Sequence, residues 1–267
     1  MSLRLVALSI ASLSVAFGCT AGTSPSPAPA GLVRVAAASD LRFALDSLIE
    51  RWTTEHADIT VVATYGSSGN LYAQISEGAP FDAFFSADVS YPRALEEAGF
   101  ADPGSTRLYG IGQIVVWARA AGDAPTDLES RGLDALTSEA VRTVAIANPE
   151  HAPYGQAAMA ALESTGLLEA VRPKLVLGEN VSQAAQFVDS GNADAGIIAL
   201  SLAVSPALVD RGRYSIVPTD VYPPLEQGVV LLDAAVDPGA GQAFIDFVLG
   251  PEGRAVLDRY GFLAPPS

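Results

Sequence analysis

The sequence predicts an α/β protein with two lobes, each a mostly parallel sheet flanked by helices, and a cleft between the lobes. Short apolar runs of strand length alternate with longer runs whose apolar residues recur at helical spacing, which is typical of strands alternating with amphipathic helices. The alternation forms two series that are joined by the strongly apolar run Ile111–Ala118, which we expect to be one strand. A chain of 267 residues is long enough for two small domains.

The first series occupies the N-terminal half of the chain. Apolar residues recur at helical spacing from Leu41 to Trp52 and predict an amphipathic helix. A second helix is expected after Ser68, and a third near Pro92, because proline suits the first turn of a helix. We expect strands at Val33–Ala37, Ile59–Ala63 and Ala83–Ser86.

The second series runs to the C-terminus. The expected strands are Thr143–Ala147, Lys174–Leu177, Ala195–Leu200, Tyr214–Val217 and Gln227–Leu232. The expected helices are Tyr154–Thr165, Ser182–Asp189, Gly241–Leu249 and Pro251–Tyr260. We expect residues 32–112 to form the first lobe, with 222–267 returning to it, and residues 113–221 to form the second. Ligands of such sheets bind beyond the carboxyl ends of the strands.

The N-terminus is predicted to be an export signal. A short region with one positive charge precedes the apolar stretch Leu5–Phe17, which is too short to span a bilayer. Residues 1–18 are therefore expected to be a signal peptide. Cys19, the one cysteine of the chain, precedes a Ser/Pro/Ala tether that extends to residue 31. This arrangement resembles a bacterial lipoprotein signal, in which Cys19 is lipidated and anchors the protein to the outer face of the cytoplasmic membrane. An ordinary secretory signal cleaved nearby also leaves an exported, periplasmic protein.

The charge balance excludes some partners. The formal net charge is −15, and Lys174 is the one lysine. Nucleic-acid binding is not expected, because phosphate neutralisation requires clustered basic residues. No later apolar run reaches the length of a membrane span. We expect a monomer that needs no cofactor and binds any anion without ammonium groups.

Two turns in the first half are the main candidates for a binding site. Ser39 follows the first predicted strand, and Ser68 follows the second within Gly66–Leu71. The start of a helix carries unpaired N–H groups and a partial positive charge, so it attracts anions. Serine adds a hydroxyl donor, and two such turns facing each other predict a neutral cage for a small oxyanion. The alternative is that each serine only caps its helix.

Two turns in the second half complete this hypothesis. Asn148–Gly155 and Gly178–Ser182 each lead from a predicted strand into a predicted helix, and the N–H of Val181 would point into the cleft. His151 is either an acid–base group or an exposed loop histidine. An exported hydrolase with Ser39 or Ser68 as nucleophile is the alternative from another class, but neither turn has the pattern G-x-S-x-G. Two dispersed histidines give little support to metal catalysis.

Taken in order, these motifs resemble those of the molybdate-binding proteins of ABC transporters (the ModA family). The similarity extends from about Val33 to Phe262. The motifs that carry it are Ala36–Leu41, Gly66–Leu71, Gly78–Asp88, Asn148–Gly155 and Gly250–Gly253 with Arg259–Phe262.

The resemblance implies a two-lobed type II periplasmic-binding-protein fold that closes on molybdate or tungstate and delivers it to a membrane permease. Such a protein is not an enzyme. The implied ligand contacts are Ser39, Ser68, Tyr154 and Val181. The two serines would donate hydroxyl and backbone N–H groups, and the other two residues backbone N–H groups; the metal atom of the oxyanion would be held only through these contacts.

One position departs from the family pattern. Ala199 stands where some members have a tyrosine whose hydroxyl reaches the anion, and Tyr154 stands where other members have alanine. We expect the Tyr154 hydroxyl to compensate. Asp40 is expected to face solvent in the first helical turn, where a carboxylate favours the helix dipole. Proteins of the same fold that bind sulfate, an organic anion or an iron chelate remain alternatives.

Overall fold

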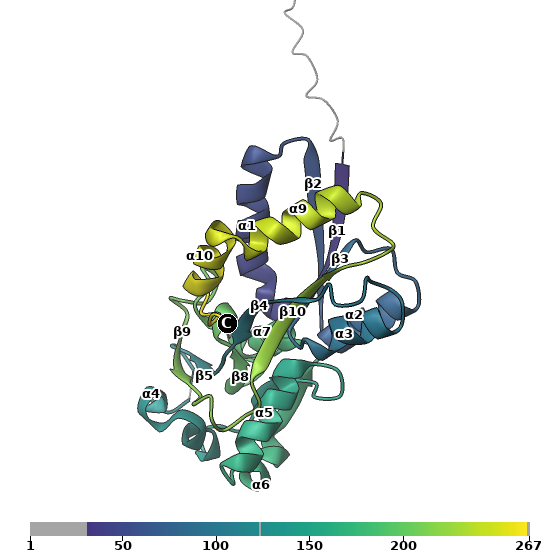
Figure 1. Ribbon diagram of the computed structural model, residues 1–267. Coiled ribbons are helices and arrows are strands. Elements are labelled where there is room, and N and C mark those ends of the chain that lie inside the picture. Colours follow the sequence, from purple (N-terminus) through teal and green to yellow (C-terminus); the bar gives the residue numbers. More distant parts are fainter. Residues whose placement is uncertain (1–30, 123, 266–267) are drawn as a thin grey trace, which may run out of the picture.

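The computed structural model describes residues 31–122 and 124–265 and consists of two α/β lobes, one above the other in Figure 1. The predicted signal peptide, Cys19 and all but the last residue of the predicted tether lie outside the described residues. No helix in the described part of the chain is both long and apolar enough to cross a membrane.

Lobe I is built on a five-stranded sheet with the order β2-β1-β3-β10-β4. Its strands are β1 (Gly31–Ala38), β2 (Ile59–Gly66), β3 (Ala83–Ser86), β4 (Arg107–Gly112) and β10 (Leu225–Leu231). β1 pairs in parallel with β2 and β3, as the alternating pattern predicts. β10 runs antiparallel to β3 and β4, so the sheet is mixed.

Lobe II repeats this plan with the order β7-β6-β8-β5-β9. Its strands are β5 (Ile114–Arg119), β6 (Val144–Ala147), β7 (Leu175–Gly178), β8 (Ala195–Ala199) and β9 (Gly212–Ile216). β6 pairs in parallel with β7 and β8, and β5 runs antiparallel to β8 and β9. Each lobe thus combines two parallel strand pairs with two antiparallel ones.

The chain crosses between the lobes at Gln113, inside the run that we expected to be one strand. Ile111–Ala118 is instead divided between β4 of lobe I and β5 of lobe II. The expectation of a single strand was wrong because apolar content does not reveal a change of sheet. Gln113 donates a side-chain hydrogen bond to the carbonyl of Gly261 (2.8 Å). Gly112 lies so close to Tyr154 and Gln227 that a Cβ atom would collide with both.

Helices cover the sheets of both lobes (Figure 1). Lobe I has α1 (Arg42–Glu55), α2 (Ser68–Ser76), α3 (Ser90–Glu97), α9 (Pro238–Leu249) and α10 (Pro251–Arg259). Lobe II has α4 (Leu128–Arg131), α5 (Pro153–Ser164), α6 (Leu168–Val171), α7 (Val181–Asp189) and α8 (Leu200–Ala203). Short 3₁₀ turns occur at η1 (Ser39–Leu41), η2 (Gly132–Thr137) and η3 (Arg172–Lys174). The helices of four residues were not foreseen, because one turn is too short to show a periodicity.

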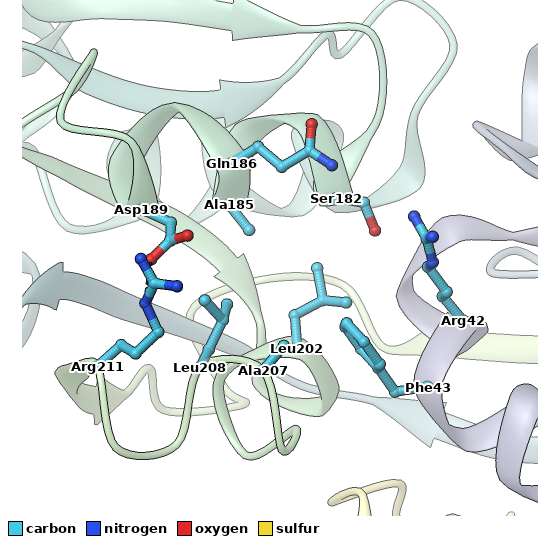
Figure 2. A pocket seen from close by; sticks show the side chains of 10 residues that line it. All are labelled: Arg42, Phe43, Ser182, Ala185, Gln186, Asp189, Leu202, Ala207, Leu208 and Arg211. Atoms are coloured by element: carbon cyan, nitrogen blue, oxygen red, sulfur yellow. Dashed lines mark ion pairs between the residues drawn. The ribbon is translucent and has the colours of Figure 1, made fainter.

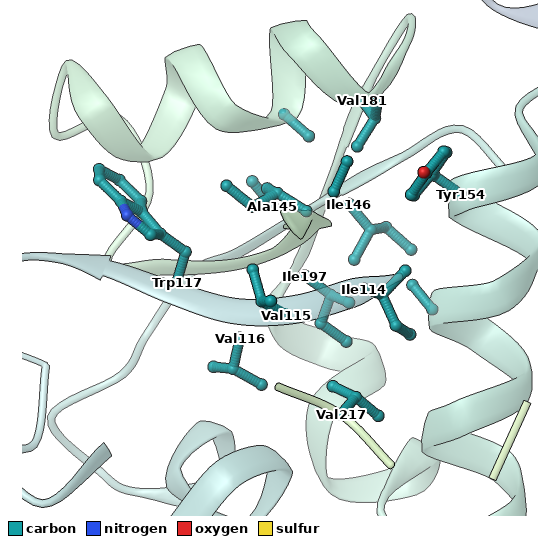
Figure 3. Packing of buried hydrophobic residues seen from close by; sticks show 14 of the residues in the cluster. Ile114, Val115, Val116, Trp117, Ala145, Ile146, Tyr154, Val181, Ile197 and Val217 are labelled. Carbon is teal, nitrogen blue, oxygen red and sulfur yellow. The ribbon is translucent and has the colours of Figure 1, made fainter. Parts of the chain in front are cut away.

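Each lobe has its own hydrophobic core, and the lobe II cluster also includes a few lobe I residues. In lobe I, Trp52 of α1 and Phe244 of α9 pack edge to face, with ring centroids 5.5 Å apart. In lobe II, the strand Ile114–Trp117 is fully buried, and the side chains of Tyr154 and Val181 belong to the same cluster (Figure 3). These two side chains therefore anchor the first turns of α5 and α7 to the sheet.

Candidate functional site

Four strand-to-helix turns meet where the two lobes contact each other. Ser39 and Ser68 follow β1 and β2 of lobe I, and Tyr154 and Val181 stand in the first turns of α5 and α7 of lobe II. All four residues are buried. Direct hydrogen bonds join the lobes here: the Ser182 hydroxyl donates to the Ser39 carbonyl (2.9 Å), and the Ser182 N–H donates to the Ser39 hydroxyl (3.4 Å). The turns that the sequence singled out are therefore close together in space.

Neither Ser39 nor Ser68 caps its own helix. The N-cap positions of η1 and α2 are Ala38 and Ser67, and neither makes a side-chain capping bond. The Ser68 hydroxyl instead accepts the N–H of Ala87 (2.9 Å), which leaves its own proton free for donation. The alternative interpretation of the two serines as ordinary N-caps is therefore not supported.

Tyr154 and Val181 can contribute only their backbone to a cleft ligand. Their side chains are packed in the core of lobe II (Figure 3). Tyr154 is the second residue of α5 and Val181 is the first of α7, so their N–H groups belong to the first turn, which has no acceptor inside the helix. Glycines bring both turns close to the sheet: a Cβ on Gly155 would collide with the carbonyl of Ala147, and one on Gly178 would lie 2.7 Å from the Ala184 nitrogen.

Asp40 does not face solvent, so that expectation was wrong. It is 1% exposed, and its Oδ2 accepts hydrogen bonds from Gln227 Nε2 (2.8 Å) and from the Tyr154 hydroxyl (3.0 Å). Its backbone carbonyl accepts a bond from the Ser201 hydroxyl (2.7 Å). The physical reason is the 3₁₀ turn at Ser39–Leu41, which delays α1 until Arg42 and directs residue 40 into the cleft.

Burial raises the pKa of the Asp40 carboxyl to about 6, although the hydrogen bonds from Gln227 and Tyr154 oppose the shift. Its Oδ1 is buried without a well-formed hydrogen bond, and only the N–H groups of its own turn favour the charge there. The groups facing it are neutral: burial and the neighbouring Asp40 hold the pKa values of Tyr109 and Tyr154 well above their usual range. The carboxylate therefore lacks a cationic partner among the side chains that contact it.

The Tyr154 hydroxyl does not act as we expected. Its one proton is donated to Asp40, and its oxygen accepts a bond from Gln227 Nε2 (3.0 Å). It is therefore not free to donate to an anion in place of the tyrosine that is absent at Ala199. Ala199 itself is buried at the end of β8.

Three residues of this network were missed at the level of sequence. Gln227 is fully buried, and its Oε1 accepts a bond from the Tyr109 hydroxyl (2.6 Å). The third is Ser201, which lies two residues after Ala199. A glutamine inside an apolar strand was the signal for Gln227, since a buried amide needs partners. Tyr109 and Ser201 gave no comparable signal.

A serine, a histidine and a glutamate adjoin at the cleft, but they do not have the geometry of a hydrolase. Nδ1 of His151 is hydrogen-bonded to the Ser67 hydroxyl (2.8 Å), and its Nε2 is 4.0 Å from Glu179 Oε2. A catalytic histidine is oriented by a hydrogen bond of about 2.6–3.2 Å to its acid, whereas Glu179 is exposed and bonded to Asn70. Ser39 and Ser68, which the hydrolase alternative would use as nucleophiles, do not bond to His151 in the described residues.

A cavity of about 270 Å³ opens beside this site, between α1 of lobe I and α7 and α8 of lobe II (Figure 2). Arg211 there is paired with Asp189 (2.9 Å), and Phe43, Leu202 and Leu208 supply an apolar wall. None of the four predicted ligand residues lines this cavity. An apolar wall does not satisfy the oxygens of a small oxyanion, so the cavity does not compete with the four turns as an oxyanion site.

Two α/β lobes whose helix N-termini face each other are the arrangement typical of solute-binding proteins. Residues 33–263 match the family model of the bacterial extracellular solute-binding proteins, and the chain belongs to this family. Members of the family bind solutes and are not enzymes, as we expected, and the extracellular location of the family agrees with the predicted export.

Within this family, the chain is similar to molybdate-binding proteins. The chain is 38% identical to the molybdate-binding protein ModA of Rhodobacter capsulatus over 79% of its own length and 80% of the relative. It is 35% identical to ModA of Azotobacter vinelandii, over 96% and 99% of the two chains. The solved periplasmic molybdate-binding protein of A. vinelandii superposes with a TM-score of 0.80 at 32% identity, covering 88% of this chain and 100% of that one. The predicted two-lobed fold is thereby confirmed.

We expect Asp40→Asn to change how stability depends on pH. A carboxyl whose pKa is raised by folding contributes most below its unfolded pKa near 3.8, and that contribution is lost as pH rises through about 6. The loss is about 3 kcal/mol for a shift of this size. The asparagine side chain cannot ionise. The free energy of unfolding of the variant relative to wild type should therefore be higher at pH 7.5 than at pH 4, by up to about that amount. Urea unfolding at both pH values measures it.

Asp102→Asn, at an exposed loop aspartate, is the control and should leave the pH dependence of wild type intact. A difference between Asp40→Asn and wild type that is equal at pH 4 and pH 7.5 would contradict the buried charge.

Proposed function

We propose that this protein captures molybdate or tungstate in the cleft, through Ser39, Ser68, Tyr154 and Val181. The main support is the convergence of these four turns from both lobes, each offering neutral hydrogen-bond donors. The similarity to molybdate-binding relatives points to the same solute. The two serines donate hydroxyl and N–H groups, and Tyr154 and Val181 donate N–H groups.

Neutral donors suit a tetrahedral dianion. Hydrogen bonds to an ionised acceptor are roughly twice as strong as neutral ones, and helix starts add a favourable dipole. Selection against sulfate follows from size, because a smaller anion leaves some donors of the cage unpaired, at about 1–3 kcal/mol for each buried group. The proposed cage therefore selects by the fit of its donors and needs no cationic side chain.

A protein that captures an oxyanion for uptake must be exported and must deliver the oxyanion to a transporter. We propose that the exported protein, held at the outer face of the cytoplasmic membrane through lipidated Cys19, delivers its oxyanion as a monomer to the permease of an ABC transporter. Residues 32–112 with 222–267 would act as one lobe and 113–221 as the other. The spacing of Cys19 after the apolar stretch Leu5–Phe17 supports the anchor.

We expect the mature protein to bind about one molybdate or tungstate per chain, and sulfate far more weakly. Ser39→Ala and Ser68→Ala should each weaken molybdate binding by about 1.5–3 kcal/mol, which is the range for a hydrogen bond to a charged group. Isothermal titration calorimetry measures both effects. Ser105→Ala, at a loop serine that bonds to Asp102, is the matched control and should bind like wild type. Equal affinity for sulfate and molybdate would refute the proposal.

We expect Tyr154→Phe to affect stability more than affinity. The variant keeps the backbone N–H and removes the hydroxyl that donates to buried Asp40, which should cost about 1.5–3 kcal/mol of unfolding free energy. Molybdate affinity should change less than about threefold, since no lost group contacts the anion. Tyr222→Phe, whose hydroxyl only accepts a long bond from Ile114, is the control. A tenfold loss of affinity at unchanged stability would show that the hydroxyl contacts the anion after all.

We expect Cys19→Ala to release the protein from the membrane fraction. The acyl chains of the proposed anchor are attached at this residue, and a doubly acylated protein is held stably at a bilayer. Fractionation of cells followed by immunoblotting measures the distribution. Membrane association equal to that of wild type would exclude the anchor and favour the ordinary secretory signal.

A further inference from the structure

The first turn of α2 is held against lobe II by contacts outside the four proposed ligand residues. Ser67 bonds to Nδ1 of His151 (2.8 Å), and the N–H of Gly69 donates to the His151 carbonyl (2.9 Å). At the next residue, the side-chain amide of Asn70 donates to the Glu179 carboxylate. Three polar groups of lobe I thus meet two residues of lobe II.

Gly69 permits this close approach. A Cβ at this position would lie 2.7 Å from the backbone oxygen of His151 and 3.0 Å from its Cβ. Both atoms belong to the opposite lobe, and one of them is main chain that cannot rotate away. The remaining close atom, the Tyr91 hydroxyl at 2.9 Å, is the far end of a lobe I side chain. The backbone of Gly69 has no positive φ, so its conformation does not require glycine. The glycine is needed for contact between the lobes.

These contacts lie at a different place from the proposed cage and involve different groups. His151 and Glu179 lie on the loops that follow β6 and β7, next to the turns that carry Tyr154 and Val181. The Glu179 side chain is 57% exposed, which places these bonds at the rim of the cleft. His151 Nε2 is 4.0 Å from Glu179 Oε2, so the two lobe II residues support each other. These bonds use no group that the proposed cage needs.

We propose that Ser67, Gly69 and Asn70 of lobe I and His151 and Glu179 of lobe II form an interlobe latch, which stabilises the closed cleft and slows the release of the bound solute. This inference rests on the proposed function only for the identity of the solute. Contacts that exist only when the lobes meet shift the equilibrium toward the closed state. A larger closed population raises apparent affinity for any solute that binds there.

The first test adds a Cβ atom at Gly69, where it would collide with His151. Gly69→Ala should speed dissociation of molybdate about tenfold or more in stopped-flow measurements, with little change in the association rate. Gly239→Ala is the matched control, since Gly239 also lies in a lobe I helix and its Cβ would meet no atom closer than 3.5 Å. A wild-type dissociation rate in Gly69→Ala would overturn the latch.

The second test is a double-mutant cycle across the cleft. Ser67→Ala and His151→Ala should each weaken molybdate binding about two- to tenfold. The double variant should be no weaker than the weaker single variant, because both remove the same bond. His56→Ala, at the other histidine of the chain, which stacks on Trp52 within lobe I, should leave the dissociation rate unchanged. Losses that multiply in the double variant would show that the two side chains act independently and would overturn the direct contact.

A third measurement does not depend on the solute. Spin labels on Glu77→Cys of lobe I and Glu163→Cys of lobe II, in the Cys19→Ala chain, report the distance between lobes without any anion. The latch predicts a larger population of long distances when Gly69→Ala is added. Equal distance distributions would overturn the latch, whereas failure of wild type to bind molybdate would overturn only the proposed function.

Discussion

The double crossing of the chain between two sheets is the constraint on which the site depends. The chain leaves lobe I at Gln113 and returns between β9 and β10, so the parallel strands of both sheets end at one cleft. Each of the strands that precede the four turns is followed by a helix or a 3₁₀ turn, and the first N–H groups of a helix lack partners within it. Donors therefore converge from both lobes. The lobes need only approach each other to surround a solute on several sides.

The position of Asp40 is unfavourable for the binding of an anion, and the sequence did not predict it. A carboxylate with neutral neighbours lies one residue from Ser39, in the region where an anion is proposed to bind. Like charges close together in a protein repel each other, and the repulsion is stronger than in water because the effective dielectric constant is lower. An anion bound at Ser39 would therefore raise the pKa of Asp40 further. The carboxyl also contacts Tyr154 of lobe II and Gln227 of the returning strand, so it joins both lobes as well as opposing the solute.

Sequence patterns predicted the strands and helices well because hydrophobic periodicity is a local property. They located the four turns for the same reason, since each turn lies between a strand-like and a helix-like run. They failed where the outcome depends on residues distant in sequence. The division of Ile111–Ala118 into two strands depends on which sheet receives each half of the apolar run. The inward direction of Asp40 depends on a 3₁₀ turn, and the partner of the Tyr154 hydroxyl is 114 positions away. No single-sequence pattern reports such a distance.

The proposed cage and the proposed latch would separate the selection of a solute from its retention. The proposed cage consists of buried hydroxyl and N–H groups whose fixed directions discriminate among anions, because an unpaired buried donor is costly. The contacts of Ser67, Gly69 and Asn70 with lobe II lie at the rim and are indifferent to the size of the solute. If these bonds form whenever the lobes meet, they would contribute equally for every anion, and would change the residence time without changing the preference. A transport protein must also release its cargo, and partly exposed polar bonds at a rim are easier to exchange for water or for a permease than bonds within the cage.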